Sequence, residues 1–128
     1  ADRVLTFRNV HNWAKAGTAE AAFESFFRAL KPGGVLGVVE HRAPAGRPLE
    51  EQIKSGYMTE AYVIEQAENA GFELEANASI NANPADDTEH PAGVWTLPPT
   101  LRQGEENRAR YLEIGESDRM TLRFRKPE

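Results

Sequence analysis

Two histidines follow the two strand-like apolar runs in the N-terminal third of the chain. His11 comes shortly after residues 4–7, and His41 follows residues 35–39. In an open α/β sheet, ligands bind beyond the carboxyl ends of the strands, and neighbouring parallel strands end at the same rim. We therefore expect the two imidazoles to lie at one rim. An imidazole titrates near neutral pH, so either ring could remove a proton from a bound substrate.

The elements that would position these histidines form a strand–helix–strand unit. Both apolar runs contain β-branched residues, which predicts buried strands, and residues 35–39 are apolar on both faces, as in a strand covered by helices on both sides. Thr18 is placed to cap the intervening helix, and residues 31–34 (KPGG) end it. Four apolar side chains share one face of that helix: Phe23, Phe26, Phe27 and Leu30. This order predicts a right-handed βαβ unit.

A second helix and two more strands are expected further along the chain. Residues 40–56 contain glycine, proline and charge, which predicts a long, mobile connection. Thr59 can cap a helix that ends at Gly71. Apolar residues then alternate over residues 72–80 and again over 120–124, which is the period of a strand. We expect these two strands to pair antiparallel at a sheet edge.

The excursion between these two strands, residues 81–117, holds four of the eight prolines and a short predicted helix near residues 105–112. Connections of that length in a compact domain are usually functional or disordered. Five of its residues could form part of a lid over an acceptor: Pro84, Asp86, Asp87, His90 and Trp95. Carboxylates and an imidazole could also bind a divalent ion, but this spacing fits no established site, so we predict no metal. A helix cap or a solvated turn is the preferred interpretation of Asp86-Asp87.

Three arginines share one face of the C-terminal strand: Arg119, Arg123 and Arg125. Such a row usually forms a solvated edge that discourages strand addition. Contact with an acidic acceptor is the alternative.

Composition limits the classes of partner. The chain has 128 residues, a formal net charge of −5 and a pI near 5.3, which argues against nucleic acid or an anionic membrane as its main partner. It lacks both cysteine and an apolar run long enough to span a membrane. We expect a soluble protein with a small-molecule partner, and the composition leaves its compartment open.

Two segments resemble class I S-adenosylmethionine-dependent methyltransferases: TFRNVHNW at residues 6–13 and ALKPGGVLGVVEH at residues 29–41. The RNV stretch and the LKPGG turn are also similar to quinone-biosynthesis methyltransferases. The chain is most similar to a bacterial group of predicted, uncharacterised methyltransferases, which shares NPADD at 83–87, VWTLPP at 94–99 and IGESDRM at 114–120. The resemblance implies an α/β, Rossmann-like class I methyltransferase fold with parallel strands, an antiparallel edge pair and helices on the faces.

The chain departs from that family in one respect. The glycine-rich loop after the first strand and the acidic residue that binds the ribose hydroxyls are both absent, and Gly33-Gly34 precede a strand instead of following one. The resemblance therefore implies the C-terminal half of the fold, with residues 1–128 as a single methyltransferase-like domain. The expected partner is a missing N-terminal segment or, as the alternative, further copies of the chain in a homo-oligomer. The parent protein would be the enzyme, and the activity of this chain alone stays open.

The same resemblance implies roles for the residues at the rim. The cofactor S-adenosylmethionine would be contacted by Arg8, Asn9, Val10 and His11. The acceptor would be contacted by Asn12, Trp13, Glu40 and His41, although packing is the preferred role of Trp13. Methyl transfer from a sulfonium is an in-line displacement, so alignment of the reactants carries most of the catalysis. His11 or His41 would serve as a catalytic base for an acceptor that must lose a proton.

Two other classes of function are compatible with the sequence. A non-catalytic methyltransferase-like module could bind a partner, or a second copy, through a sheet edge and face left open by the missing strands. A nicotinamide-binding Rossmann enzyme is the third class, but it needs the same absent loop and has no motif in its favour. The leading hypothesis is the C-terminal part of a methyltransferase that acts on a small molecule.

Overall fold

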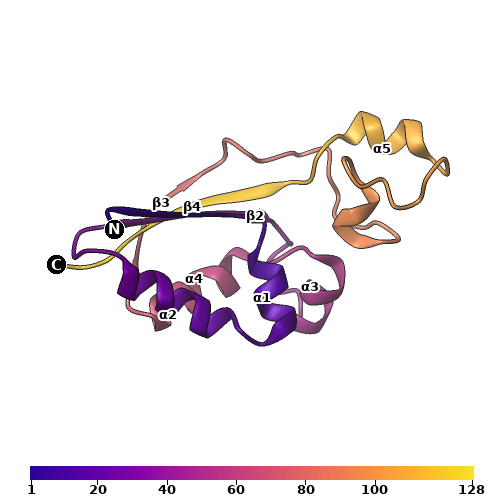
Figure 1. The fold of residues 1–128 in the computed structure, drawn as a ribbon. Coiled ribbons are helices and arrows are strands. Elements are labelled where there is room, and N and C mark those ends of the chain that lie inside the picture. The colour runs from indigo at the N-terminus through magenta and orange to yellow at the C-terminus, as the bar shows by residue number, and fades with distance from the viewer.

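A computed structural model describes residues 1–128 as a four-stranded sheet with helices on one face (Figure 1). The strands are β1 (Arg3–Phe7), β2 (Val35–His41), β3 (Glu73–Ala78) and β4 (Arg119–Arg125), in the spatial order β1-β2-β4-β3. β1 and β2 are parallel, whereas β4 is antiparallel to both β2 and β3. The expected parallel pair and antiparallel pair are therefore confirmed.

The helices are α1 (Val10–Ala16), α2 (Ala19–Ala29), α3 (Leu49–Ser55), α4 (Glu60–Asn69) and α5 (Arg108–Ile114), with a 3₁₀ helix, η1, at Gly93–Thr96. Figure 1 shows α1 to α4 beneath the sheet, while the segment with η1 and α5 lies at the end of the sheet where α1 begins. The Thr59 hydroxyl caps α4 as expected, because its Oγ1 accepts from the Tyr62 N–H at 3.1 Å. None of the helices is long and apolar enough to cross a membrane.

Four local predictions differ from the structure. Thr18 stands at the N-cap of α2, but its side chain makes no capping hydrogen bond. Residues 40–56, predicted to be a mobile connection, contain α3. The short helix of the excursion begins later than predicted, at Arg108. β3 ends at Ala78, and an irregularity between Leu74 and Ala76 shifts its register against β4. The apolar residues that alternate over residues 72–80 therefore do not share one buried face of the sheet.

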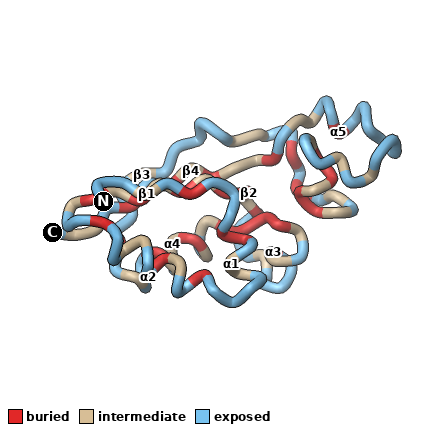
Figure 2. The backbone as a smooth tube through the Cα atoms, in the orientation of Figure 1, coloured by how far each residue is buried: buried red, intermediate tan, exposed pale blue.

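The hydrophobic core lies between the sheet and the helices (Figure 2). β2 contributes Leu36 and Val38, and β4 contributes Met120, Leu122 and Phe124, all fully or almost fully buried. These alternate positions share one face of the sheet because successive side chains of a strand point to opposite faces. The helices and the connections beside them complete the core with Val10, Phe23, Leu30, Met58, Val63, Ala67 and Phe72.

The opposite face of the sheet has no helix on it (Figure 1). Leu5 and Phe7 of β1 are 64% and 55% exposed there, and a largely apolar depression of about 370 Å³ runs over all four strands. The expectation of helices on both faces is therefore wrong for this chain. Its helices suffice to cover one face only, so the second set of apolar side chains on β2, which includes Val35 and Val39, remains partly exposed.

A candidate active site at the carboxyl ends of β1 and β2

His11, Glu40 and His41 form a buried cluster where β1 and β2 end. The ring centroids of His11 and His41 are 5.5 Å apart, so the expected meeting of the two imidazoles at one rim is confirmed. Glu40 Oε2 accepts from the His11 backbone N–H at 2.9 Å, and Oε1 accepts from the His41 backbone N–H at 2.8 Å. The Glu40 carboxylate thus lies at the first turn of α1, where the positive end of the helix dipole stabilises an anion.

Glu40 also contacts the imidazole of His11. The distance from His11 Nδ1 to Glu40 Oε1 is 3.1 Å. A carboxylate can only accept a hydrogen bond, so Nδ1 carries the proton and donates it. The neutral His11 ring is then left with its lone pair on Nε2, which has no hydrogen-bond partner in the protein. This arrangement of an imidazole oriented by a carboxylate is suited to proton abstraction.

His41 differs from His11 in its electrostatic environment. Burial is the largest cause that lowers the pKa of His41 from 6.5 to about 3, and the neighbouring His11 ring and the guanidinium groups of Arg119 and Arg8 act in the same direction. Its Nδ1 is hydrogen-bonded to Ser117 Oγ. His41 is therefore neutral at physiological pH and a poor proton acceptor. The expectation that both rings titrate near neutrality is wrong for His41, because burial cannot be read from a strand-end position.

A cavity of about 290 Å³ opens beside these two rings. Its lining comes from the ends of three strands and from the excursion: Phe7, Arg8, Asn9, His11, His41, Val94, Trp95, Pro98, Pro99, Thr100, Ser117 and Arg119. We refer to it as the rim pocket. Arg119 is paired with His41 across the β2–β4 ladder, so the antiparallel strand brings a cation to the same rim. The excursion supplies one wall through Trp95, Pro98 and Pro99. Of the five residues expected in a lid, only Trp95 lines this pocket.

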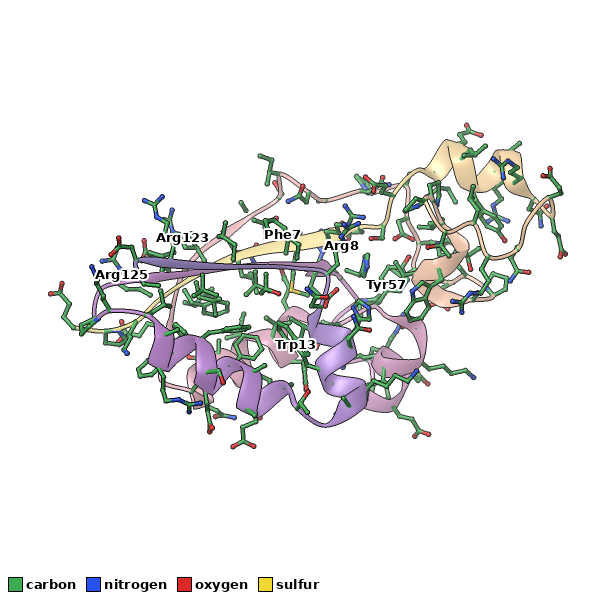
Figure 3. The ribbon with its side chains drawn as sticks, viewed as in Figure 1. Phe7, Arg8, Trp13, Tyr57, Arg123 and Arg125 are labelled. Carbon is green, nitrogen blue, oxygen red and sulfur yellow. The ribbon has the colours of Figure 1, made fainter.

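Arg8 adopts a backbone conformation that is uncommon for a side chain other than glycine. Its φ is 56°, and its N–H donates to the Val39 carbonyl at 2.7 Å, which continues the β1–β2 ladder for one more residue. The chain turns there and enters α1 at Val10. This turn places Arg8 and Asn9 in the pocket wall, and Figure 3 shows Arg8 at that end of the sheet.

Four residues expected to bind cofactor or acceptor lie elsewhere. Val10 is fully buried in the core, and Asn12 is exposed outside the pocket. Trp13 packs against Phe23 and Phe26 on the helical side of the sheet (Figure 3). These corrections share one reason: residues 10–13 are helical, so consecutive side chains point in different directions.

Glu40 is the fourth such residue. Its side chain is completely buried and contacts His11 and His41 instead of lining the pocket. It lies one position before His41 on β2, and neighbouring side chains of a strand point to opposite faces. Glu40 therefore acts on a bound molecule only through the histidines.

Sequence reasoning missed Ser117 and gave Arg119 a different role. Arg119, Arg123 and Arg125 were expected on a solvated edge strand, but β4 lies inside the sheet between β2 and β3. Arg123 and Arg125 do stay exposed, and both pair with Glu75. Arg119 alone reaches the rim, which its position as the first residue of β4 would have indicated once the strand order was known.

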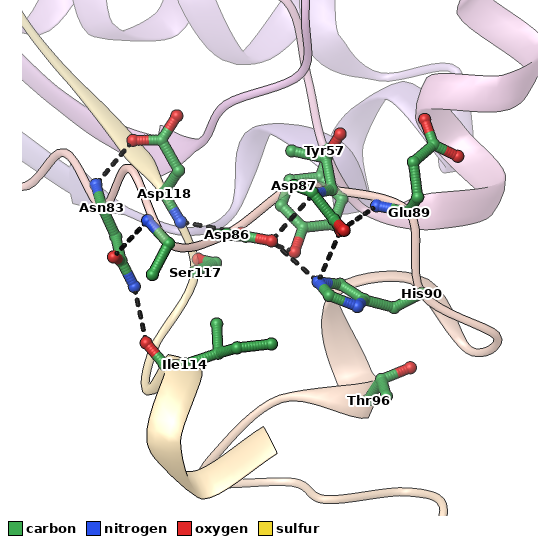
Figure 4. Close-up of polar contacts among 12 residues, drawn as sticks. Tyr57, Asn83, Asp86, Asp87, Glu89, His90, Thr96, Ile114, Ser117 and Asp118 are labelled. Atoms are coloured by element: carbon green, nitrogen blue, oxygen red, sulfur yellow. Dashed lines mark hydrogen bonds and ion pairs between the residues drawn. The ribbon is translucent and has the colours of Figure 1, made fainter. Parts of the chain in front are cut away.

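A second polar cluster anchors the excursion (Figure 4). The Asp86 carboxylate accepts from the Tyr57 hydroxyl at 2.8 Å, from the Thr88 and Asp118 backbone N–H groups at 2.9 Å each, and lies 2.7 Å from His90 Nε2. The side chains of Asp86 and His90 are almost completely buried. The expectation of a solvated turn at Asp86 is wrong, because its partners come from positions up to 32 residues away.

Two groups bring potential metal ligands within 4.8 Å of one another: His11, Glu40 and His41, and Asp86, Asp87 and His90. In the first group, Glu40 already accepts three hydrogen bonds, and Arg8 and Arg119 add positive charge nearby. In the second, Asp86 is occupied by four donors. Both donor sets thus favour internal hydrogen bonds over a cation.

The fold is that of a methyltransferase-like α/β protein. Among solved structures, the chain is similar to the [4+2]-cyclase SpnF, at 19% identity and a TM-score of 0.62 over 98% of this chain and 50% of that one. It is also similar to the complex between the Haloferax volcanii Trm112 methyltransferase activator and a protein described as a methyltransferase, at 18% identity and a TM-score of 0.58. That match covers all of this chain and 54% of the other.

The chain thus spans about half the length of both structural neighbours. No protein-family model matches the chain, and no curated protein matches it in sequence. At these identities the likeness concerns the fold.

Proposed function

We propose that this chain forms the acceptor-binding part of a class I S-adenosylmethionine-dependent methyltransferase that acts on a small molecule. The observation that carries the proposal is His11, whose Nδ1 is held by Glu40 and whose Nε2 has no protein partner, in the wall of the rim pocket. The pocket lies beyond the carboxyl ends of parallel strands, where α/β proteins bind ligands. The methyltransferase-like fold supports the same reaction class.

In this proposal, His11 Nε2 accepts the proton of the acceptor group while that group attacks. Glu40 keeps the imidazole in the required tautomer and stabilises the charge that the ring gains. His41 stays neutral and, through its hydrogen bond to Ser117, connects the end of β2 to the segment before β4. Bound S-adenosylmethionine would supply an electrophilic methyl group on its sulfonium. The pocket walls contribute alignment of the acceptor, on which an in-line displacement mainly depends.

The residues present fit one end of this cofactor. Asn9, at the end of β1, offers an amide suited to the methionine part. No carboxylate lines the rim pocket, so this chain offers no acidic partner for the ribose hydroxyls there. Gly33 and Gly34 form a tight turn before β2, where a Cβ on Gly34 would lie 2.8 Å from the Lys31 carbonyl oxygen. The lining of the rim pocket therefore includes no acidic group for binding the ribose hydroxyls.

Isothermal titration with S-adenosylhomocysteine tests the proposal. We expect saturable one-to-one binding by the folded chain, weakened by Asn9→Ala and unchanged by Asn69→Ala at the end of α4, far from the pocket in sequence. Absence of heat with a chain shown to be folded by circular dichroism would contradict the proposal for this polypeptide.

A second candidate function is a non-catalytic module that binds a protein through the open sheet face. Leu5 and Phe7 are strongly exposed on this face, and β1 has a hydrogen-bonded neighbour on one side only. Contiguous exposed apolar surface and free strand edges are typical of interaction sites. One structural neighbour is itself in complex with a methyltransferase activator, which is compatible with a protein partner here.

A further inference from the structure

The rim pocket differs in charge from the rest of the chain. The whole sequence has 20 acidic and 15 basic residues. The twelve residues that line the pocket include two arginines and two histidines, and none is an aspartate or glutamate. The two arginines thus give the lining of the pocket a positive charge that no lining carboxylate offsets, although the chain as a whole is acidic.

The two arginines come from different strands and act on the same ring. Arg8 follows β1, and Arg119 begins β4 opposite His41. Both lower the pKa of His41, which lies between them on β2, so both charges are close to the pocket floor. Arg8 forms no ion pair within the chain, and the Arg119 guanidinium reaches only Glu116, at 3.3 Å.

Arg119 also has an unsatisfied donor. Its Nε is buried and has no hydrogen-bond partner, although the side chain as a whole is 14% exposed. A buried donor without an acceptor costs free energy, and guanidinium groups are matched in shape to carboxylate oxygens. A carboxylate in the pocket would contact the exposed part of the Arg119 guanidinium, whose one carboxylate partner, Glu116, is itself 58% exposed.

We infer that the rim pocket binds a carboxylate-bearing small molecule, with Arg8 and Arg119 holding the carboxylate and Trp95 with Pro98-Pro99 contacting its apolar body. This inference rests on the proposed function, because it names the class of methyl acceptor. The carboxylate end is fixed by charge, while His11 Nε2 in the same wall reaches a second polar group of the molecule. An amide or ester of the same shape would lack the charge and bind more weakly.

Benzoate and benzamide, which share size and shape and differ in charge, are suitable probes for an NMR titration of the ¹⁵N-labelled chain. We expect benzoate to shift the Trp95 indole signal and to bind at least about tenfold more tightly than benzamide. Added NaCl should lower the affinity for benzoate. Arg119→Gln and Arg8→Gln should each reduce benzoate affinity about tenfold, and Arg8→Lys should restore part of it. Arg123→Gln, on the open face, is the matched control and should leave the affinity unchanged.

Equal affinity for benzoate and benzamide would overturn the inference, as would an equal loss in the Arg123→Gln variant. If Arg119→Gln does not fold, the benzoate and benzamide comparison with the unaltered chain still decides. A repeat titration with saturating S-adenosylhomocysteine separates the two proposals. Loss of benzoate binding there would assign the arginines to the cofactor and overturn the inference, while retained binding supports it. Benzoate binding without any S-adenosylhomocysteine binding would contradict the proposed function alone.

Discussion

Glu40 holds His11 at two points: its Oε2 accepts from the His11 backbone N–H at 2.9 Å, and its Oε1 lies 3.1 Å from the ring Nδ1. The carboxylate thereby joins the end of β2 to the first turn of α1. One residue thus satisfies a backbone N–H in the first turn of a helix and orients the imidazole in the pocket wall. Asn9, at the N-cap position of α1, makes no such bond with its side chain.

Replacing Glu40 with glutamine should destabilise the fold and release the His11 ring. The amide has one acceptor oxygen where the carboxylate has two, so one buried N–H loses its partner, at a cost of about 1–3 kcal/mol in the free energy of unfolding. Urea denaturation measures this loss. Glu24→Gln, on the exposed side of α2, is the control and should be neutral. Equal stability of the two variants would contradict the role assigned to Glu40.

His41 should remain neutral at pH values far below the usual pKa of an imidazole. Its pKa is lowered to about 3 in the folded chain, whereas the unfolded chain takes up this proton near pH 6.5. The unfolded state therefore binds more protons between these values, and the contribution of His41 to stability is lost as pH falls from about 6.5 to 3. Histidine NMR signals recorded across this range check the pKa directly. A His41 ring that titrates near pH 6 would refute the assignment.

His41→Gln should flatten the pH dependence of stability. Glutamine keeps a group that can hydrogen-bond to Ser117 but does not titrate. We expect the slope of unfolding free energy against pH, between pH 4 and 6.5, to be smaller in the variant than in the unaltered chain. Parallel slopes in the two proteins would show that other groups dominate acid unfolding.

Tyr57→Phe should loosen the excursion from the sheet. The Tyr57 hydroxyl donates to Asp86 Oδ2 at 2.8 Å, and burial raises the pKa of Tyr57 so that this proton stays on the hydroxyl. Removing it leaves a buried carboxylate one donor short, at a cost of about 1–3 kcal/mol. Hydrogen exchange should then speed up at the Thr88 and Asp118 amides, which share Asp86. Tyr62→Phe removes a hydroxyl without a protein partner and should leave this exchange unchanged.

The open sheet face should promote association. Leu5 is 64% exposed and its side chain covers Gly37, on which a Cβ would lie 2.8 Å from Leu5 Cδ2. Leu5→Lys places a charge on this face and should lower the mass observed by light scattering at high protein concentration. Leu112→Lys, on α5, alters a similarly exposed leucine elsewhere and should not. A monomeric unaltered chain would contradict association through this face.

Local pattern determined most of the secondary structure. Continuous apolar runs located β1 and β2, and periodic apolar residues located α2, α4 and β4, because an element with one buried face requires that spacing. The meeting of His11 and His41 could also be predicted, since two parallel strands in register end at the same rim. Glu40, however, was expected in the pocket wall, and only the direction of its side chain along β2 shows that it lies behind His11.

Tertiary structure decided the features that depend on distant partners. Asp86 looks like a turn residue in sequence, yet Tyr57 and Asp118 make it the centre of a buried cluster. Arg119 belongs to the rim because β4 inserts between β2 and β3. The low pKa of His41 follows from burial beneath neighbouring elements. Periodicity records which face of an element is apolar, whereas burial, charge and strand order depend on which other elements cover that face.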